Sequence, residues 1–128
     1  MSSQDWNWDP WNYRQSIDMT DRTGNLAGFK VHASDGDVGK VDEATTDVGA
    51  SYLVVDTGPW IFGHKVMLPA GIIERVDWDN EAIWVDRTKD QIKDSPKYDP
   101  DTGGSDLTYR ESLNSYYRDT YRDSTLEP

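Results

Sequence analysis

Residues 51–58 read Ser-Tyr-Leu-Val-Val-Asp-Thr-Gly, a short apolar run that ends in turn-forming residues. Its apolar residues are consecutive rather than alternating, which predicts a strand over residues 51–56 that is buried on both faces. Residues 57–60, Thr-Gly-Pro-Trp, end this strand, and Gly58 is expected to adopt a positive φ there. The neighbouring segments are interpreted outward from this strand.

Further short runs rich in β-branched residues lie on both sides of it, and residues that favour turns separate them. The expected strands cover residues 26–32, 38–46, 51–56, 65–68, 72–78 and 82–86. Short, closely spaced strands joined by short turns are typical of a small antiparallel barrel or sandwich. Closure would also remove exposed strand edges. The fold class expected is therefore mainly β, with about six strands in a small closed barrel.

Two capping boxes predict helices after the strands. Thr88 and Gln91 have the spacing of the first box, and Ser95-Pro96 is expected to end the short helix that follows. The second box is expected at residues 108–111, Thr-Tyr-Arg-Glu. Aromatic residues then recur at helical spacing, which predicts an amphipathic C-terminal helix with a tyrosine stripe.

The chain of 128 residues fits one domain with tails better than two domains. Residues 1–25 are expected to form a polar, aromatic N-terminal arm, and residues 26–98 the barrel domain. Residues 99–128 are expected to form a linker and the tyrosine-rich helix.

Charge and composition limit the classes of partner. The chain has 13 basic and 24 acidic residues, a net charge of −11, and no cysteine. Direct binding to nucleic acid or to an anionic membrane is not expected, because both need clustered Lys and Arg. Basic proteins or cations fit the sign of the charge better. With no apolar run long enough to span a membrane and no signal-peptide pattern at the N-terminus, we expect a cytoplasmic protein.

Four segments, in this order, resemble the sequence of PRC-barrel domains. They are residues 26–31 with 35–41, residues 52–58, residues 65–70, and residues 88–96 with 98–100. The last segment looks like the characteristic C-terminal helix of that family. The resemblance covers roughly residues 24–100.

The resemblance implies a small barrel of about six strands with a short helix, and no shared catalytic residue. The family includes the cytoplasmic domain of the photosynthetic reaction centre H subunit and the C-terminal domain of a ribosome maturation factor. Its members act mainly as protein-binding platforms. The expected function is a non-enzymatic protein-binding or self-associating adaptor, such as a homodimer. The alternative is an accessory role in ribosome assembly or in a bioenergetic complex.

Aromatic residues outside the aliphatic strands are the candidate partner-binding residues, because exposed rings of this size are costly in water. They are Trp6, Trp8, Trp11, Tyr13, Trp60, Phe62, Tyr109, Tyr116, Tyr117 and Tyr121. Three interpretations of the N-terminal tryptophans stay open. The arm wraps back onto its own barrel, the rings contact a partner subunit, or a disordered arm folds on binding.

No catalytic residue, cofactor or metal site is expected. Asp56-Thr57-Gly58 is the pattern with which retroviral-type aspartic proteases present a carboxylate, which leaves a remote protease alternative. Residues 35–40 fit neither a calcium loop nor a phosphate loop. His32 and His64, the two histidines, have no second ligand at metal-binding spacing.

Overall fold

The structure is a computed structural model. It describes residues 9–14, 17, 26–45, 49, 51–58, 65–99, 101 and 106–126, and for residues 121–126 it describes the backbone only.

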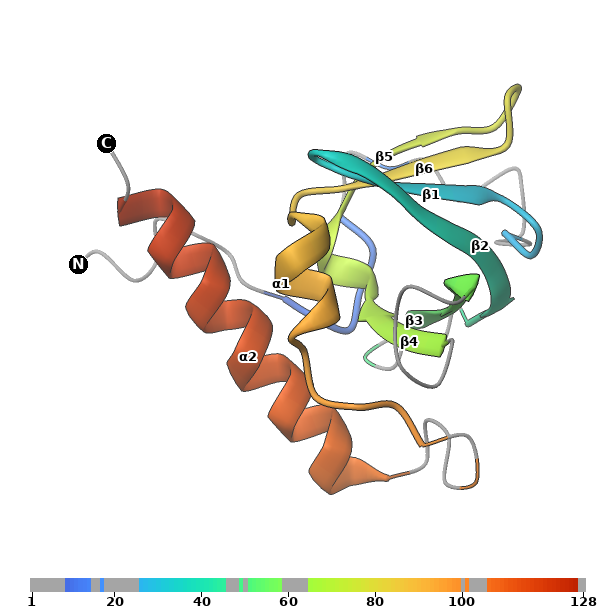
Figure 1. The fold of residues 1–128 in the computed structure, drawn as a ribbon. Helices are drawn as coiled ribbons and strands as arrows, with labels where there is room; N and C mark the ends of the chain where they lie inside the picture. The colour runs from blue at the N-terminus through green and yellow to red at the C-terminus, as the bar shows by residue number, and fades with distance from the viewer. Residues whose placement is uncertain are drawn as a thin grey trace.

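The described residues form one six-stranded sheet and two α-helices, so the fold is mainly β (Figure 1). The strands are β1 (Lys30–Ala33), β2 (Gly36–Ala44), β3 (Tyr52–Asp56), β4 (Lys65–Pro69), β5 (Ile73–Asp77) and β6 (Ala82–Val85). Their order in the sheet is β4-β3-β2-β1-β6-β5. All neighbours are antiparallel except β1 and β6, which are parallel.

The six strands predicted from the sequence are all present, and the largest difference is at the first. A strand was expected from Leu26, but β1 begins at Lys30. The preceding residues form a turn instead, because the Phe29 N–H donates to the Leu26 carbonyl at 3.1 Å and Gly28 has a φ of 87°. The predicted burial of the third strand on both faces is confirmed, since its three aliphatic residues are at most 2% exposed.

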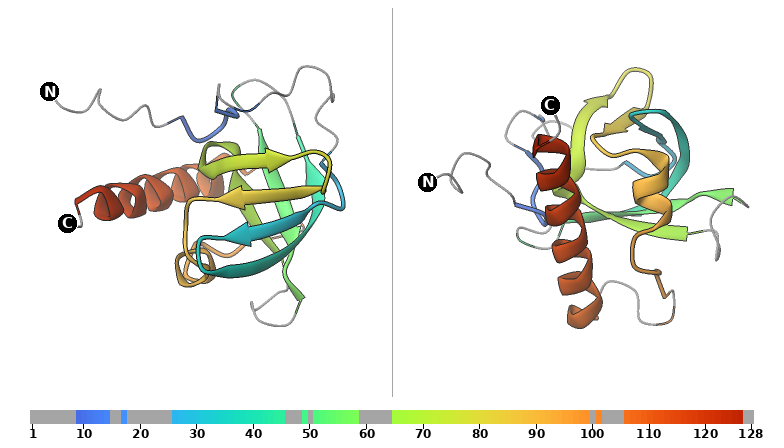
Figure 2. Two further views of the ribbon diagram at one scale, coloured as in Figure 1. Left: turned by 90° about the horizontal axis from the view of Figure 1, so that it is seen from above. Right: turned by 60° about the vertical axis from the view of Figure 1, so that its left-hand side comes forward.

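The sheet is strongly curved but open. β4 and β5 are its two edge strands, and the 3-10 turn η3 (Ala70–Ile72) joins them directly. Figure 2 shows that β5, β6, β1 and β2 lie side by side while β3 and β4 fold beneath them. Irregular register in three strand pairs accompanies this curvature. The described strands do not pair across the gap between β4 and β5, so the closed barrel expected from the sequence is not confirmed.

The first helix, α1 (Lys89–Lys93), has the predicted capping box. The Gln91 N–H donates to the Thr88 hydroxyl oxygen at 3.1 Å, and the Gln91 side-chain oxygen accepts from the Thr88 N–H at 2.9 Å. This reciprocal pairing satisfies two backbone N–H groups at the helix start.

The second helix, α2 (Leu107–Leu126), is present, but the capping box predicted at residues 108–111 is wrong. The helix begins one residue before Thr108. The Asp106 carboxylate accepts a hydrogen bond from the Tyr109 N–H at 3.2 Å and so takes the capping position. Thr108 therefore lies inside the first turn, where it is exposed.

The hydrophobic core includes residues from the chain ends as well as from the strands. Ile17 precedes the sheet in sequence, and Leu113 and Tyr117 belong to α2, yet all three lie in the same buried cluster as the strand residues. In the part of the chain that is described, no helix combines the length and the apolar character needed to cross a membrane.

Candidate functional site

An arm segment, defined here as residues 9–14, lies against the turn between β4 and β5. The Gly71 N–H donates to the Pro10 carbonyl at 2.9 Å, and the Ser51 N–H donates to the Trp11 carbonyl at 2.9 Å. The approach is close because Gly71 has no side chain: a β-carbon there would lie 2.3 Å from the Asp9 carbonyl oxygen. The arm segment therefore supplies hydrogen-bond acceptors to backbone N–H groups near the gap between β4 and β5.

Side chains of the arm segment strengthen this docking. The Tyr13 hydroxyl donates to the Thr45 carbonyl at 2.7 Å, just beyond the end of β2. The Arg14 guanidinium donates through Nε to the Gly71 carbonyl at 3.0 Å. Gly71 thus both donates to the arm segment and accepts from it.

The helix α2 packs through its aromatic face against the core of the protein and against α1. Leu113 and Tyr117 are fully buried. The Tyr116 hydroxyl donates to the Gln91 carbonyl of α1 at 2.5 Å. The Tyr109 hydroxyl donates to the Pro96 carbonyl at 3.4 Å, a longer contact. The tyrosine stripe predicted from the sequence therefore faces the protein's own core and α1 along the described side chains.

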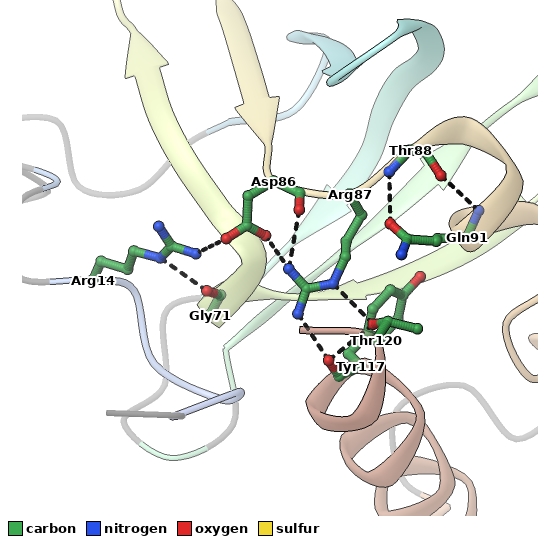
Figure 3. A network of polar contacts seen from close by, with 8 residues as sticks. All are labelled: Arg14, Gly71, Asp86, Arg87, Thr88, Gln91, Tyr117 and Thr120. Carbon is green, nitrogen blue, oxygen red and sulfur yellow. Dashed lines mark hydrogen bonds and ion pairs between the residues drawn. The ribbon is translucent and has the colours of Figure 1, made fainter. Parts of the chain in front are cut away.

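A polar network connects the two docked ends (Figure 3). The Arg87 guanidinium is 1% exposed and donates to the Thr120 hydroxyl at 3.0 Å and to the Tyr117 carbonyl at 2.8 Å. The Asp86 carboxylate forms ion pairs with both Arg87 and Arg14. Asp86 therefore lies between an arginine of the arm segment and an arginine that contacts α2.

Arg87 depends on this network because a buried charge is destabilising unless it is paired and hydrogen-bonded. Asp86 supplies the opposite charge, and α2 supplies two of the acceptors. Arg87 therefore has all of these hydrogen-bond acceptors only while α2 is docked.

The two ends also touch directly, through a cation–π pair. The Arg110 guanidinium of α2 lies 4.8 Å from the centroid of the Trp11 ring. Arg110 also donates to the Gly49 carbonyl at 3.3 Å. The arm segment, α2 and the turn that follows β2 meet at this point.

Five of the ten candidate partner-binding residues have described side chains, and these pack against the protein's own core. Trp11, Tyr13, Tyr109 and Tyr116 are half-buried, and Tyr117 is fully buried. The other candidates lie outside the described side chains: Trp6, Trp8, Trp60, Phe62 and Tyr121. For Trp11, wrapping of the arm onto its own sheet is the arrangement seen. Contact of these residues with a partner stays a prediction.

Burial changes the acidity of the docked tyrosines. Desolvation raises the pKa of Tyr13 to about 12, and it also raises the pKa values of Tyr109, Tyr116 and Tyr117 above the usual value. These phenols are therefore neutral at physiological pH and act as hydrogen-bonding groups on apolar rings.

The raised pKa values predict a loss of stability at alkaline pH. In the unfolded chain these tyrosines ionise near pH 10, whereas in the folded chain they ionise only at higher pH. The contribution of these tyrosines to stability is thus fully present below about pH 9 and is lost as the pH rises through 10 towards 12. We expect the urea midpoint to fall over this range. Ionisation of Tyr13 accounts for up to roughly 2 kcal/mol of the loss in the free energy of unfolding.

The matched control for this measurement is Tyr13→Phe, which removes one ionising group. Its midpoint should fall less steeply with pH than that of the unchanged chain. A midpoint that stays constant up to about pH 11 in both proteins would contradict the prediction.

A separate row of side chains crosses the outer surface of the sheet. Arg75 is the cross-strand partner of Trp84, Trp84 of His32, and His32 of Asp37, so the row spans β5, β6, β1 and β2. The Arg75 guanidinium lies 3.8 Å from the Trp84 ring centroid. The His32 ring stacks on Trp84 at 5.1 Å, and its Nδ1 lies 2.7 Å from the Asp37 carboxylate.

We call these four residues the outer row; as a group they were not predicted from the sequence. Arg75 and Asp37 are exposed, and Trp84 and His32 are half-buried. Side chains alternate along the last strand, so Trp84 lies on the other face of the sheet from Ile83 and Val85. That alternation in the sequence already indicates the solvent face for Trp84. The register between four strands, however, can be obtained only from the folded sheet.

The Asp56-Thr57-Gly58 sequence forms the turn expected from its glycine. Gly58 has a φ of 70°, and its N–H donates to the Asp56 carboxylate at 3.1 Å. The Asp56 side chain is exposed and caps its own turn. In the described part of the chain, no group of three or more His, Cys, Asp or Glu residues is arranged to hold a metal ion.

The chain was also compared with known proteins. No protein-family model matches the chain, and a search of curated proteins finds no match either.

Proposed function

We propose that this chain is a non-enzymatic adaptor of the PRC-barrel type that binds a second copy of itself or another protein. The proposal includes a PRC-type barrel architecture, a homodimer and a cytoplasmic location. The order of the family-like segments along residues 26–100 supports it, together with the small six-stranded sheet and the short capped helix α1.

The observation that carries the binding role is the outer row. Trp and Arg are the residue types most often found at the energetic centre of protein interfaces. Here a tryptophan lies between a guanidinium and an imidazole on a surface that faces solvent. Its position on four neighbouring strands gives it a rigid base, which reduces the entropy lost on binding.

Geometry also favours a protein as the ligand of this surface. The Arg75 guanidinium lies over the indole ring and is exposed, so its N–H groups can donate to carboxylate or carbonyl oxygens of a partner. Asp37, at the other end of the row, is 85% exposed and can accept from a basic side chain. The net charge of −11 makes a basic or self-complementary protein surface a better partner than a polyanion.

The test is sedimentation of the full chain over a wide range of protein concentration. The full chain is used because Leu113 and Tyr117 belong to the core, so a fragment of residues 24–100 would lose part of it. We expect a dimer for the unchanged chain and a shift to monomer for Trp84→Ala and for Arg75→Ala. Lys40→Ala, an exposed change elsewhere on β2, should leave the dimer intact.

Two results would contradict this proposal. A monomer at every concentration for the unchanged chain would contradict self-association. A dimer that persists in Trp84→Ala, with circular dichroism unchanged in all variants, would contradict the outer row as the contact surface.

A further inference from the structure

The two ends of the described chain depend on one carboxylate. Arg14 belongs to the arm segment, Arg87 follows β6 and contacts α2, and Asp86 pairs with both. Arg14 makes no contact with α2 among the interactions of Figure 3, and Thr120 makes none with the arm segment. Any influence of one end on the other through this network must therefore pass through Asp86 and Arg87.

Removal of the arm segment has a direct electrostatic consequence at Arg87. Arg14 holds the Asp86 carboxylate from one side while Arg87 holds it from the other. Asp86 is 19% exposed, so without Arg14 its carboxylate is less fixed and can turn towards water. The buried Arg87 then has a weaker counter-charge, which makes its burial beneath α2 less favourable.

The reverse consequence follows when α2 leaves. Arg87 loses the Thr120 hydroxyl and the Tyr117 carbonyl, two of its acceptors, and becomes accessible to water. A hydrated Arg87 no longer fixes the Asp86 carboxylate in the position that Arg14 requires. The arm segment then loses the ion pair between Arg14 and Asp86, one of the contacts that hold it to the sheet.

We propose that docking of the arm segment and docking of α2 are cooperatively coupled through Asp86, so that a partner that withdraws either end also loosens the other. Such coupling is reciprocal by thermodynamic necessity. It does not depend on the outer row or on the adaptor role. It adds a release mechanism in which both ends of the chain respond to a single binding event.

Hydrogen–deuterium exchange of the full chain tests the coupling with two sets of reporters. The amides of Gly71 and Ser51 donate to arm-segment carbonyls, so their exchange reports release of the arm segment. The amides of residues 113–120 report release of α2. The amides of β1 in the middle of the sheet serve as the reference for global unfolding.

Two variants act on opposite ends. Arg14→Met is expected to speed exchange of the α2 reporters about tenfold, although Arg14 lies outside α2. Thr120→Val, which removes the acceptor of Arg87 Nε, is expected to speed exchange at Gly71 and Ser51 by a similar factor. The control Lys65→Met removes the ion pair between Lys65 and Asp42 and should change neither set.

A third variant separates Asp86 from the direct contact between Trp11 and Arg110. In an Asp86→Asn background, Arg14→Met should no longer affect the α2 reporters. Persistence of the effect in that background would overturn the role of Asp86. The proposal is also overturned if either single variant leaves the opposite reporters unchanged, or if the β1 reference amides accelerate by the same factor.

Discussion

Replacing Leu113 by alanine is expected to lower the free energy of unfolding by about 2–5 kcal/mol, the usual range for truncating a buried leucine. Leu113 is fully buried in the cluster that joins α2 to the strands. The change removes apolar contacts and leaves a cavity between the helix and the sheet, which neighbouring side chains fill only in part. Urea denaturation followed by tryptophan fluorescence measures the effect.

Leu107 provides a matched control because it is the same residue type in the same helix and is 70% exposed. Leu107→Ala should change the free energy of unfolding by less than about 0.5 kcal/mol. If Leu113→Ala lowers the free energy of unfolding as little as Leu107→Ala does, the stability of the sheet does not depend on α2. That result would contradict the inclusion of the helix in the core.

Replacing Gly39 by alanine is expected to destabilise the protein by about 3 kcal/mol or more, because backbone must move to admit the new atom. A β-carbon at Gly39 of β2 would lie 2.1 Å from the carbonyl oxygen of Asp56 and 2.9 Å from the α-carbon of Thr57. Both contacts are with main chain at the end of β3, so no side-chain rotation relieves them. The adjacent pairing of Lys40 with Asp56 would be disturbed.

Gly58→Ala is the control for the general effect of replacing glycine. Gly58 has a positive φ of 70°, but a β-carbon there would meet no atom within 4 Å. Its cost is therefore backbone strain alone, about 1 kcal/mol. If Gly39→Ala proves no more destabilising than Gly58→Ala in thermal or urea denaturation, β2 does not approach the end of β3 as closely as described.

The sequence was a good guide to local structure. Every strand interpreted from an aliphatic run is present, and the Thr88–Gln91 capping box forms as predicted. These features depend on neighbouring residues, so their signals lie within a few positions of the chain. The misplaced cap of α2 has the same local origin, since Asp106 and Thr108 are both good capping residues and sequence alone does not choose between them.

The candidate site was predicted less completely. The aromatic character of both tails was evident, and for Trp11 and Tyr117 the structure shows the ring against the chain's own core. The outer row was missed because Arg75, Trp84, His32 and Asp37 come from four strands and have no common spacing in the sequence. The network of Asp86 was missed for a related reason, since ion-pair partners 72 residues apart leave no local pattern.

By itself, the sequence determined the strands, the short capped helix, the amphipathic tail helix and the net negative charge, because periodicity, turn residues and composition can be read from the chain without its tertiary contacts. The tertiary structure alone decided that the sheet stays open between β4 and β5, that the arm segment and α2 dock on either side of Asp86, and that Trp84 is held between Arg75 and His32. Each of these depends on which distant segments come together, and that is set by the packing of the whole core.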